Sequence, residues 1–270
     1  MVFVSIVPQK FFVEQIGGGY FDVRVMVEPG ANPATYEPKP SQMAKLTSAK
    51  LYFAVGVPFE SAWLDRIAAV NRGMQIVYTD RKIAKIMMVE KHQLPLPLAQ
   101  HVVGGRYSIP LDPHIWLSPG LVKKQAAVIL SALAAIAPQR SAEFRENHRL
   151  FVEKITALDQ QLRLLFRDKQ GLQFMVFHPS WGYFAREYDL RQIAVEMAGK
   201  SPKFAQLQKL IHYARDKNIR IIFVQPQFST KKAEIIAREI HGRVVTADPL
   251  AYEWFANLRS VAEKISGAIR

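Results

Sequence analysis

Cysteine is absent from the 270-residue chain. The chain therefore has no thiol nucleophile, no cysteine-ligated zinc, no disulfide framework and no thiol to carry a lipid anchor. No run of 18 apolar residues occurs either, and from this we expect no membrane-spanning helix. With 49% hydrophobic and 22% charged residues, the composition is that of a globular protein and excludes disorder as the main state.

Long tracts of one charge are also missing, although the formal net charge is +13. The densest positive spots are the pairs Lys123-Lys124 and Lys231-Lys232, and no tract reaches five like charges. Dispersed positive charge is typical of solvated faces, so we expect no nucleic-acid partner.

The chain shows no basic or apolar leader before its first strand-like segment. Either the protein is cytoplasmic, or a signal peptide has been removed and replaced by Met1. Composition does not decide between these two alternatives.

Strand-like and helix-like segments alternate along the chain, which predicts an α/β fold with mostly parallel sheets. The expected strands are 2–7, 22–27, 51–55, 75–78, 174–177, 192–195, 220–224 and 244–245. The expected helices are 8–16, 41–49, 60–70, one opening at Ser118-Pro119, 141–168, 181–187, 204–217, 231–241 and 254–269. Two lobes, each with a four-stranded sheet flanked by helices, follow from this order.

One apolar stripe recurs at helical spacing and predicts a single helix from about 141 to 168. The stripe consists of Phe144, Phe151, Ile155, Leu158, Leu162 and Leu165. Such a helix would be roughly 40 Å long. It is either a plain core helix or a stiff connector, and its central position favours the connector. The expected organisation is an N-terminal lobe at 1–138, a connecting helix at 139–169 and a C-terminal lobe at 170–270.

Residues 80–112 break the alternation and predict a long loop, which contains His92 and His101. Long loops in compact domains are usually functional or mobile.

Three residues capable of binding a metal lie at or near strand ends. His178 follows the strand 174–177 directly, Asp248 follows 244–245 closely, and His114 lies just before the Ser118 cap. Ligands in α/β sheets bind beyond the carboxyl ends of the strands, and two imidazoles with a carboxylate suit zinc, manganese or iron(II). The alternative is structural, because His-Pro and Asp-Pro are common in turns and separations of 64 and 70 positions provide no local ligand spacing.

Several segments, in this order along the chain, resemble the metal-binding periplasmic solute-binding proteins of zinc and manganese ABC importers, a group that includes streptococcal adhesin lipoproteins. The matching segments are 29–38 (Pro-Gly-Ala-Asn-Pro-Ala-Thr-Tyr-Glu-Pro), 57–64 (Val-Pro-Phe-Glu-Ser-Ala-Trp-Leu), 112–119 (Asp-Pro-His-Ile-Trp-Leu-Ser-Pro), 177–185 (Phe-His-Pro-Ser-Trp-Gly-Tyr-Phe-Ala), 224–229 (Val-Gln-Pro-Gln-Phe-Ser) and 247–250 (Ala-Asp-Pro-Leu). The resemblance covers nearly the whole chain.

The resemblance implies two α/β lobes joined by one long rigid helix, with the metal held in the cleft between them. Zinc-type members typically use three His, often with one acidic residue. Carried over, the ligands are His114 from the first lobe, and His178 and Asp248 from the second.

This sequence departs from the family pattern at two positions. Ala34 stands where the family usually has its first His, and Gln225 stands where members often have Glu. Water could replace the missing ligand, and so could a nearby side chain. The candidate side chains are Asn32, Glu37, His92 and His101. Metal binding could also be lost or redirected, and an engineered His-to-Ala change would look the same.

The resemblance implies an extracytoplasmic carrier and not an enzyme. It would be a periplasmic monomer that captures Zn²⁺, with Mn²⁺ or Fe²⁺ as alternatives, and delivers it to an ABC importer permease. A zinc hydrolase is the competing class, because three ligands and an open position also describe catalytic zinc. Its general base would be Glu37. A degenerate member without metal is the third alternative.

Overall fold

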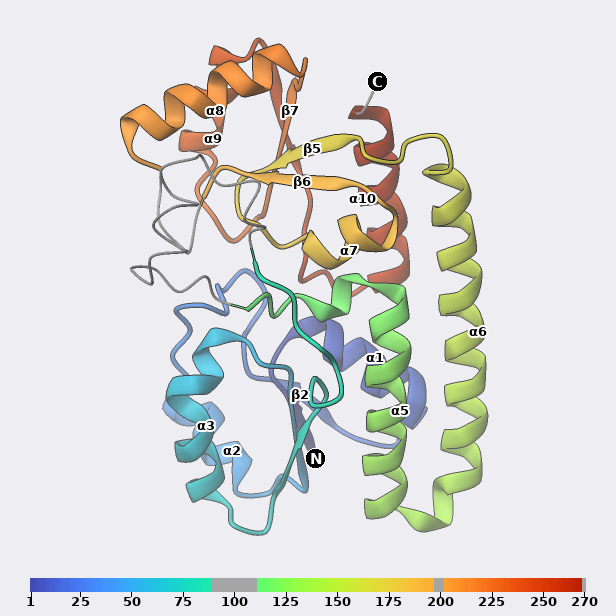
Figure 1. The fold of residues 1–270 in the computed structure, drawn as a ribbon. Helices are drawn as coiled ribbons and strands as arrows, with labels where there is room; N and C mark the ends of the chain where they lie inside the picture. Colours follow the sequence, from blue (N-terminus) through green and yellow to red (C-terminus); the bar gives the residue numbers. More distant parts are fainter. Residues whose placement is uncertain (89–110, 197–201, 269–270) are drawn as a thin grey trace. The chain divides into compact units, whose positions relative to one another are not determined.

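The computed structural model describes residues 1–88, 111–196 and 202–268. The chain forms two compact units, each with its own sheet (Figure 1). Unit 1 comprises Met1–Ala84, Ser118–Gln161 and Leu250–Asn257, and unit 2 comprises Lys85–Leu117, Leu162–Pro249 and Leu258–Arg270. The sequence-based lobe boundaries at 138/139 and 169/170 stay a prediction.

Unit 1 contains a four-stranded parallel sheet in the order β2-β1-β3-β4. Its strands are β1 (Val2–Val4), β2 (Val23–Val25), β3 (Leu51–Ala54) and β4 (Gln75–Tyr78). β1 and β3 lie in the centre and are buried along their whole length, as parallel strands covered on both faces must be. The helices of this unit include α1 (Val7–Gly17), α2 (Pro40–Leu46), α3 (Pro58–Val70) and α5 (Pro119–Ile136).

Proline marks the first turn of all four of these helices. Its missing N–H costs nothing there, and its fixed φ suits the helix. The predicted Ser118 cap is confirmed, because its side chain accepts a hydrogen bond from the backbone N–H of Leu121 at 3.2 Å. The predicted strand 2–7 is too long: it ends at Val4, since Pro8 lies in the first turn of α1.

Helix α5 corrects the expectation that no helix could span a membrane. It has 18 residues and a mean hydropathy of 1.3, so it is long and apolar enough to cross a membrane, although charged residues interrupt its apolar run. Helices in the core of a globular protein can be equally long and apolar. Helix α5 packs against α1, and its Val122, Ile129 and Leu133 are completely buried.

Unit 2 contains the second four-stranded parallel sheet, in the order β6-β5-β7-β8. Its strands are β5 (Gln173–Val176), β6 (Arg191–Ala194), β7 (Ile221–Val224) and β8 (Arg243–Thr246). Helices α7 (Gly182–Glu187), α8 (Phe204–Asp216) and α9 (Lys231–Glu239) connect them. Apolar residues of α8 and α9 pack with Met175, Ile222 and Val224 of the strands to form the core of this unit. Helix α10 (Trp254–Ala268) follows β8.

The predicted long helix is α6 (Ser141–Leu165), preceded by a short 3-10 turn at Pro138–Arg140. Phe144, Phe151, Ile155, Leu158 and Leu162 of its apolar stripe are all buried. The helix belongs to unit 1 as far as Gln161 and to unit 2 from Leu162, so it joins the two units. The fold class, two parallel α/β sheets with one long joining helix, is confirmed.

Candidate metal centre

Two imidazoles meet within unit 2. The ring centroids of His114 and His178 lie 5.6 Å apart, with their planes inclined at 73°. His178 lies two residues beyond the end of β5, and His114 directly precedes a 3-10 turn at Ile115–Leu117. Two of the three predicted ligands are therefore neighbours in space, although 64 positions separate them in sequence.

Each imidazole has a carboxylate on its Nδ1 side. Asp112 Oδ1 lies 2.7 Å from Nδ1 of His114, and Glu196 Oε2 lies 2.9 Å from Nδ1 of His178. A carboxylate at Nδ1 favours the tautomer that carries its proton there, which leaves the lone pair of Nε2 to a metal. In both rings the carboxylate therefore favours the tautomer in which Nε2 can bind zinc.

The pKa of His114 also favours the neutral form of this ring. Burial lowers the pKa of His114 below its ordinary value, the Asp112 carboxylate opposes this shift, and His178 adds to it. Lowering the pKa of a base disfavours its protonated form. His114 is thus neutral at neutral pH and does not have to lose a proton before it binds a cation.

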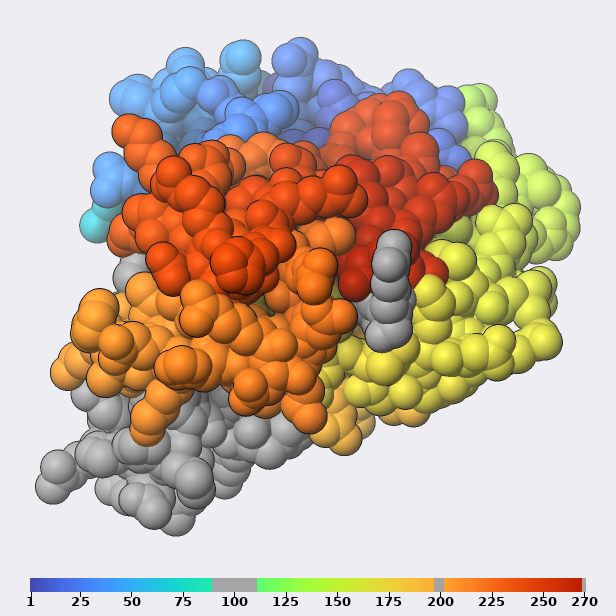
Figure 2. All heavy atoms as spheres, turned by 90° about the horizontal axis from the view of Figure 1, so that it is seen from above, coloured from blue at the N-terminus to red at the C-terminus, as the bar shows by residue number. Residues whose placement is uncertain are grey.

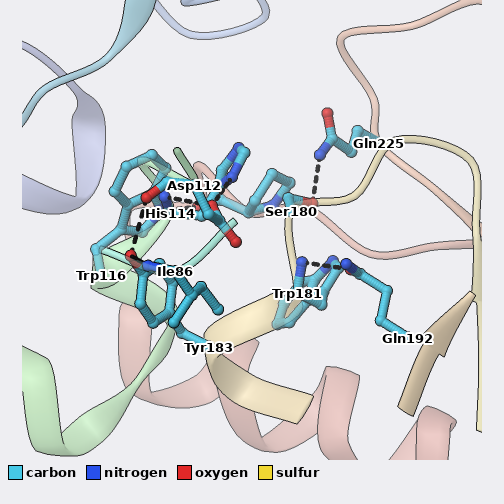
Figure 3. A network of polar contacts seen from close by, with 10 residues as sticks. Ile86, Asp112, His114, Trp116, Ser180, Trp181, Tyr183, Gln192 and Gln225 are labelled. Atoms are coloured by element: carbon cyan, nitrogen blue, oxygen red, sulfur yellow. Dashed lines mark hydrogen bonds and ion pairs between the residues drawn. The ribbon is translucent and has the colours of Figure 1, made fainter. Parts of the chain in front are cut away.

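Backbone contacts fix the Asp112 segment (Figure 3). The N–H of Asp112 donates to Ile86 O at 2.8 Å, the N–H of Ile86 donates to the Tyr183 hydroxyl at 3.1 Å, and that hydroxyl donates to Asp112 O at 2.9 Å. Met87 and Leu111 add one antiparallel bridge. Asp112 is completely buried, and its Oδ2 has no hydrogen-bond partner among the described residues.

Contacts of neighbouring residues tie Asp248 to the surroundings of the imidazole pair. Gln227 donates to Asp248 Oδ1 at 2.9 Å, and the next residue, Phe228, stacks on His178 at 5.2 Å. On the other side, Trp116 Nε1 donates to Pro249 O at 2.7 Å, and the Trp116 ring packs on His114. Within the described ranges, no group of three or more His, Asp or Glu side chains is arranged to hold a metal ion.

The other candidate donors belong to unit 1 or lie outside the described residues. Asn32 and Glu37 belong to unit 1, as does Ala34. Asn32 Oδ1 accepts a hydrogen bond from the backbone N–H of Ala34 at 2.8 Å. His92 and His101 lie outside the described residues. His114, predicted on the first lobe, belongs by its contacts to unit 2 together with His178 and Asp248.

Sequence reasoning missed Asp112, Glu196 and Gln227. Asp112 had a local signal, because it stands two residues before His114. Glu196 lies 18 positions from His178, but the N–H of Glu196 donates to Phe177 O at 2.8 Å, as the neighbouring parallel strands β5 and β6 require. Aligning the carboxyl ends of these two strands in the predicted parallel sheet would have indicated that Glu196 lies near His178. No pattern in the sequence indicates that Gln227 contacts Asp248.

The family model of ZnuA, the periplasmic component A of the zinc-uptake complex, matches residues 2–268. The chain belongs to the ZnuA family. A crystal structure of ZnuA is 39% identical, has a TM-score of 0.90, and is aligned over 100% of this chain and 98% of that one. A ZnuA deletion mutant with zinc bound is also 39% identical, with a TM-score of 0.89 and coverage of 99% and 96%. The high-affinity zinc uptake system protein ZnuA of Bacillus subtilis (strain 168) is 26% identical, over 92% of this chain and 78% of its own length.

Membership of the ZnuA family confirms the resemblance stated from the sequence. The family consists of solute-binding proteins of zinc and manganese ABC uptake systems and not of enzymes. The zinc-hydrolase alternative is therefore wrong.

Proposed function

We propose that this protein carries zinc as its cargo, bound through Nε2 of His114, Nε2 of His178 and the carboxylate of Asp248. The observation that carries the proposal is the pair of neighbouring imidazoles, each with a carboxylate at Nδ1. Zinc lies about 2.0–2.1 Å from a ligating imidazole nitrogen, so two rings on one tetrahedral zinc have centroids about 5 Å apart. The separation of 5.6 Å is close to this value.

The donor set favours zinc over the alternatives. Imidazole nitrogen suits zinc, whereas manganese prefers a shell of oxygen ligands. The carboxylates of Asp112 and Glu196 also raise the basicity of the two rings, which strengthens their bonds to the metal. Mn²⁺ is accordingly proposed as weaker cargo, and Fe²⁺, which imidazole also suits, as an alternative cargo.

The fourth position is open in this proposal, because Ala34 has no side-chain donor. Three protein ligands leave one place for water or for another donor, such as Asn32, Glu37, His92 or His101. If the site needs an imidazole there, the chain is a degenerate member with lost or redirected binding, which is the second candidate function.

Delivery completes the proposed role. A solute-binding protein of this family hands its cargo to the permease of an ABC importer, so we propose that this chain delivers its metal to such a permease. We also propose that it acts as a monomer in the periplasm.

Isothermal titration with Zn²⁺ tests the proposal. Wild-type protein should bind one equivalent, and His178→Ala should bind at least about tenfold more weakly. His212→Ala is the matched control, because His212 is exposed on α8 in the same unit and should leave the affinity unchanged. Wild-type protein that binds no zinc would establish the degenerate alternative, and unchanged affinity in His178→Ala would remove that residue from the ligand set.

A further inference from the structure

Unit 2 has a cavity at the edge of its sheet opposite to the candidate metal centre. The cavity has a volume of about 820 Å³ and is lined at the amino-terminal starts of β5, β7 and β8 and by the end of α10. His178 and Asp248 instead follow the carboxyl ends of β5 and β8. The two ends of a four-residue strand are about 10 Å apart, so the cavity is a separate site. Figure 2 looks onto the face of the molecule that carries the segments around it.

The charge of this cavity has one sign. Lys217, Arg220 and Arg243 are exposed at its wall, His241 joins them, and none of the lining residues is acidic. Within the described part of the chain, neither Lys217 nor either arginine forms an ion pair with a carboxylate. Like charges gathered in this way repel one another, and an anion between them would relieve that repulsion.

The backbone places Arg220 and Arg243 next to each other at the starts of neighbouring strands. The N–H of Arg243 donates to Arg220 O at 2.8 Å, which holds the starts of β7 and β8 side by side. Gly242 permits this approach, because a Cβ at that position would come within 2.1 Å of Arg220 O. No other residue fits there, so the neighbouring arginines depend on a backbone geometry that only glycine supplies.

The Arg220 side chain is held in place by its own turn. Its Nε donates to Asn218 Oδ1 at 3.0 Å, and Asn218 adopts a left-handed conformation with φ of 53°. Among the described residues, the terminal nitrogens of this guanidinium make no hydrogen bond. A positioned guanidinium fork matches two oxygens of a phosphate, which a lysine alone does not.

We propose that this cavity binds a phosphate group, held by Arg220, Arg243 and Lys217. The cavity has the size of a small-molecule site. The cations are exposed, so binding should be moderate in strength and should weaken as salt is added. The phosphate belongs either to a small soluble molecule or to the headgroup of an anionic lipid, which share this chemistry.

The test compares two variants of equal charge. Arg220→Gln/Arg243→Gln removes two cations from the cavity, and Lys209→Gln/Lys231→Gln removes two exposed cations elsewhere in unit 2. The probes are inorganic phosphate and pyrophosphate in calorimetry, and phosphatidylglycerol against phosphatidylcholine vesicles in co-sedimentation. Circular dichroism and thermal unfolding of the same samples confirm that both variants fold, so the outcome does not depend on the proposed function.

The wild-type protein and the lysine variant should bind alike, and the arginine variant should bind at least about tenfold more weakly. Saturable binding of phosphate or pyrophosphate identifies a soluble ligand, and binding of phosphatidylglycerol vesicles alone identifies a lipid headgroup. Equal binding by the two variants, or no saturable binding of any probe by wild-type protein, would overturn the proposal.

Discussion

Asp112 Oδ1 accepts two hydrogen bonds from His114, one from its backbone N–H at 2.8 Å and one from Nδ1 of its ring at 2.7 Å. One oxygen therefore sets both the position and the tautomer of the imidazole. The other oxygen, Oδ2, is buried without a hydrogen-bond partner in the part of the chain that the structure describes. Keeping such a group buried costs folding free energy, which indicates that Asp112 serves the site more than the stability of the fold.

Asp112→Asn should therefore weaken zinc binding by about ten- to a hundredfold, because the neutral amide no longer raises the basicity of the His114 ring. The melting temperature of the metal-free protein should stay the same or rise, since a buried charge is removed. Titration calorimetry and thermal unfolding measure the two effects, with the exposed Asp65→Asn as control. A lower melting temperature with unchanged zinc affinity would show that Asp112 is structural.

Glu196 should have the corresponding effect on His178. Glu196→Gln keeps the size of the side chain and removes the charge 2.9 Å from Nδ1, so zinc affinity should fall by about tenfold or more. The measurement is the same titration, with Glu239→Gln as the control at an exposed carboxylate. An affinity equal to that of wild-type protein would disprove a role of Glu196 in holding the ring.

The lowered pKa of His114 predicts how stability depends on pH. In the unfolded chain this group takes up a proton near its ordinary pKa of 6.5, whereas the folded protein takes it up only at lower pH. The unfolded state then binds more protons, so the stability of the metal-free protein should fall as the pH drops below about 6.5. Zinc affinity should fall over the same range, because protons compete for the imidazoles.

Urea unfolding of the metal-free protein between about pH 5 and about pH 7.5 tests this pH dependence. His114→Gln should flatten the profile in this window, whereas His212→Ala should leave its slope as in wild-type protein. The explanation fails if the His114 variant loses as much stability on acidification as the wild type does.

Ala34→His restores the imidazole that the family usually has at this position. If the loop 29–38 reaches the metal, zinc affinity should rise by about tenfold or more, since a fourth protein ligand replaces water. Thr35→His places the same side chain one position along this exposed loop and serves as the control. Equal affinity of Ala34→His and wild-type protein would show that this loop does not contribute to the site.

Local patterns predicted the fold well. The alternation of strand-like and helix-like segments predicted two parallel sheets, and the apolar stripe from Phe144 to Leu165 predicted α6. The ends of elements were less predictable, because they depend on particular turns. Helix α6 ends at Leu165 and not at Asp168. Strand β1 ends at Val4, because α1 begins at Val7.

The site was predictable only in part. His114, His178 and Asp248 could be proposed as ligands from their positions near strand ends, but the distances between them depend on contacts between residues far apart in the sequence. The pairing of Ile86 with Asp112 and the hydrogen bond of Tyr183 place His114 in unit 2, and no local pattern records these contacts.

A crystal structure of the zinc-loaded protein, with anomalous data at the zinc edge, tests the central claim most directly. We expect one strong anomalous peak at about 2.0–2.1 Å from Nε2 of both His114 and His178, with a carboxylate oxygen of Asp248 among the ligands. A peak at another place, or no peak in crystals grown with stoichiometric zinc, would contradict it.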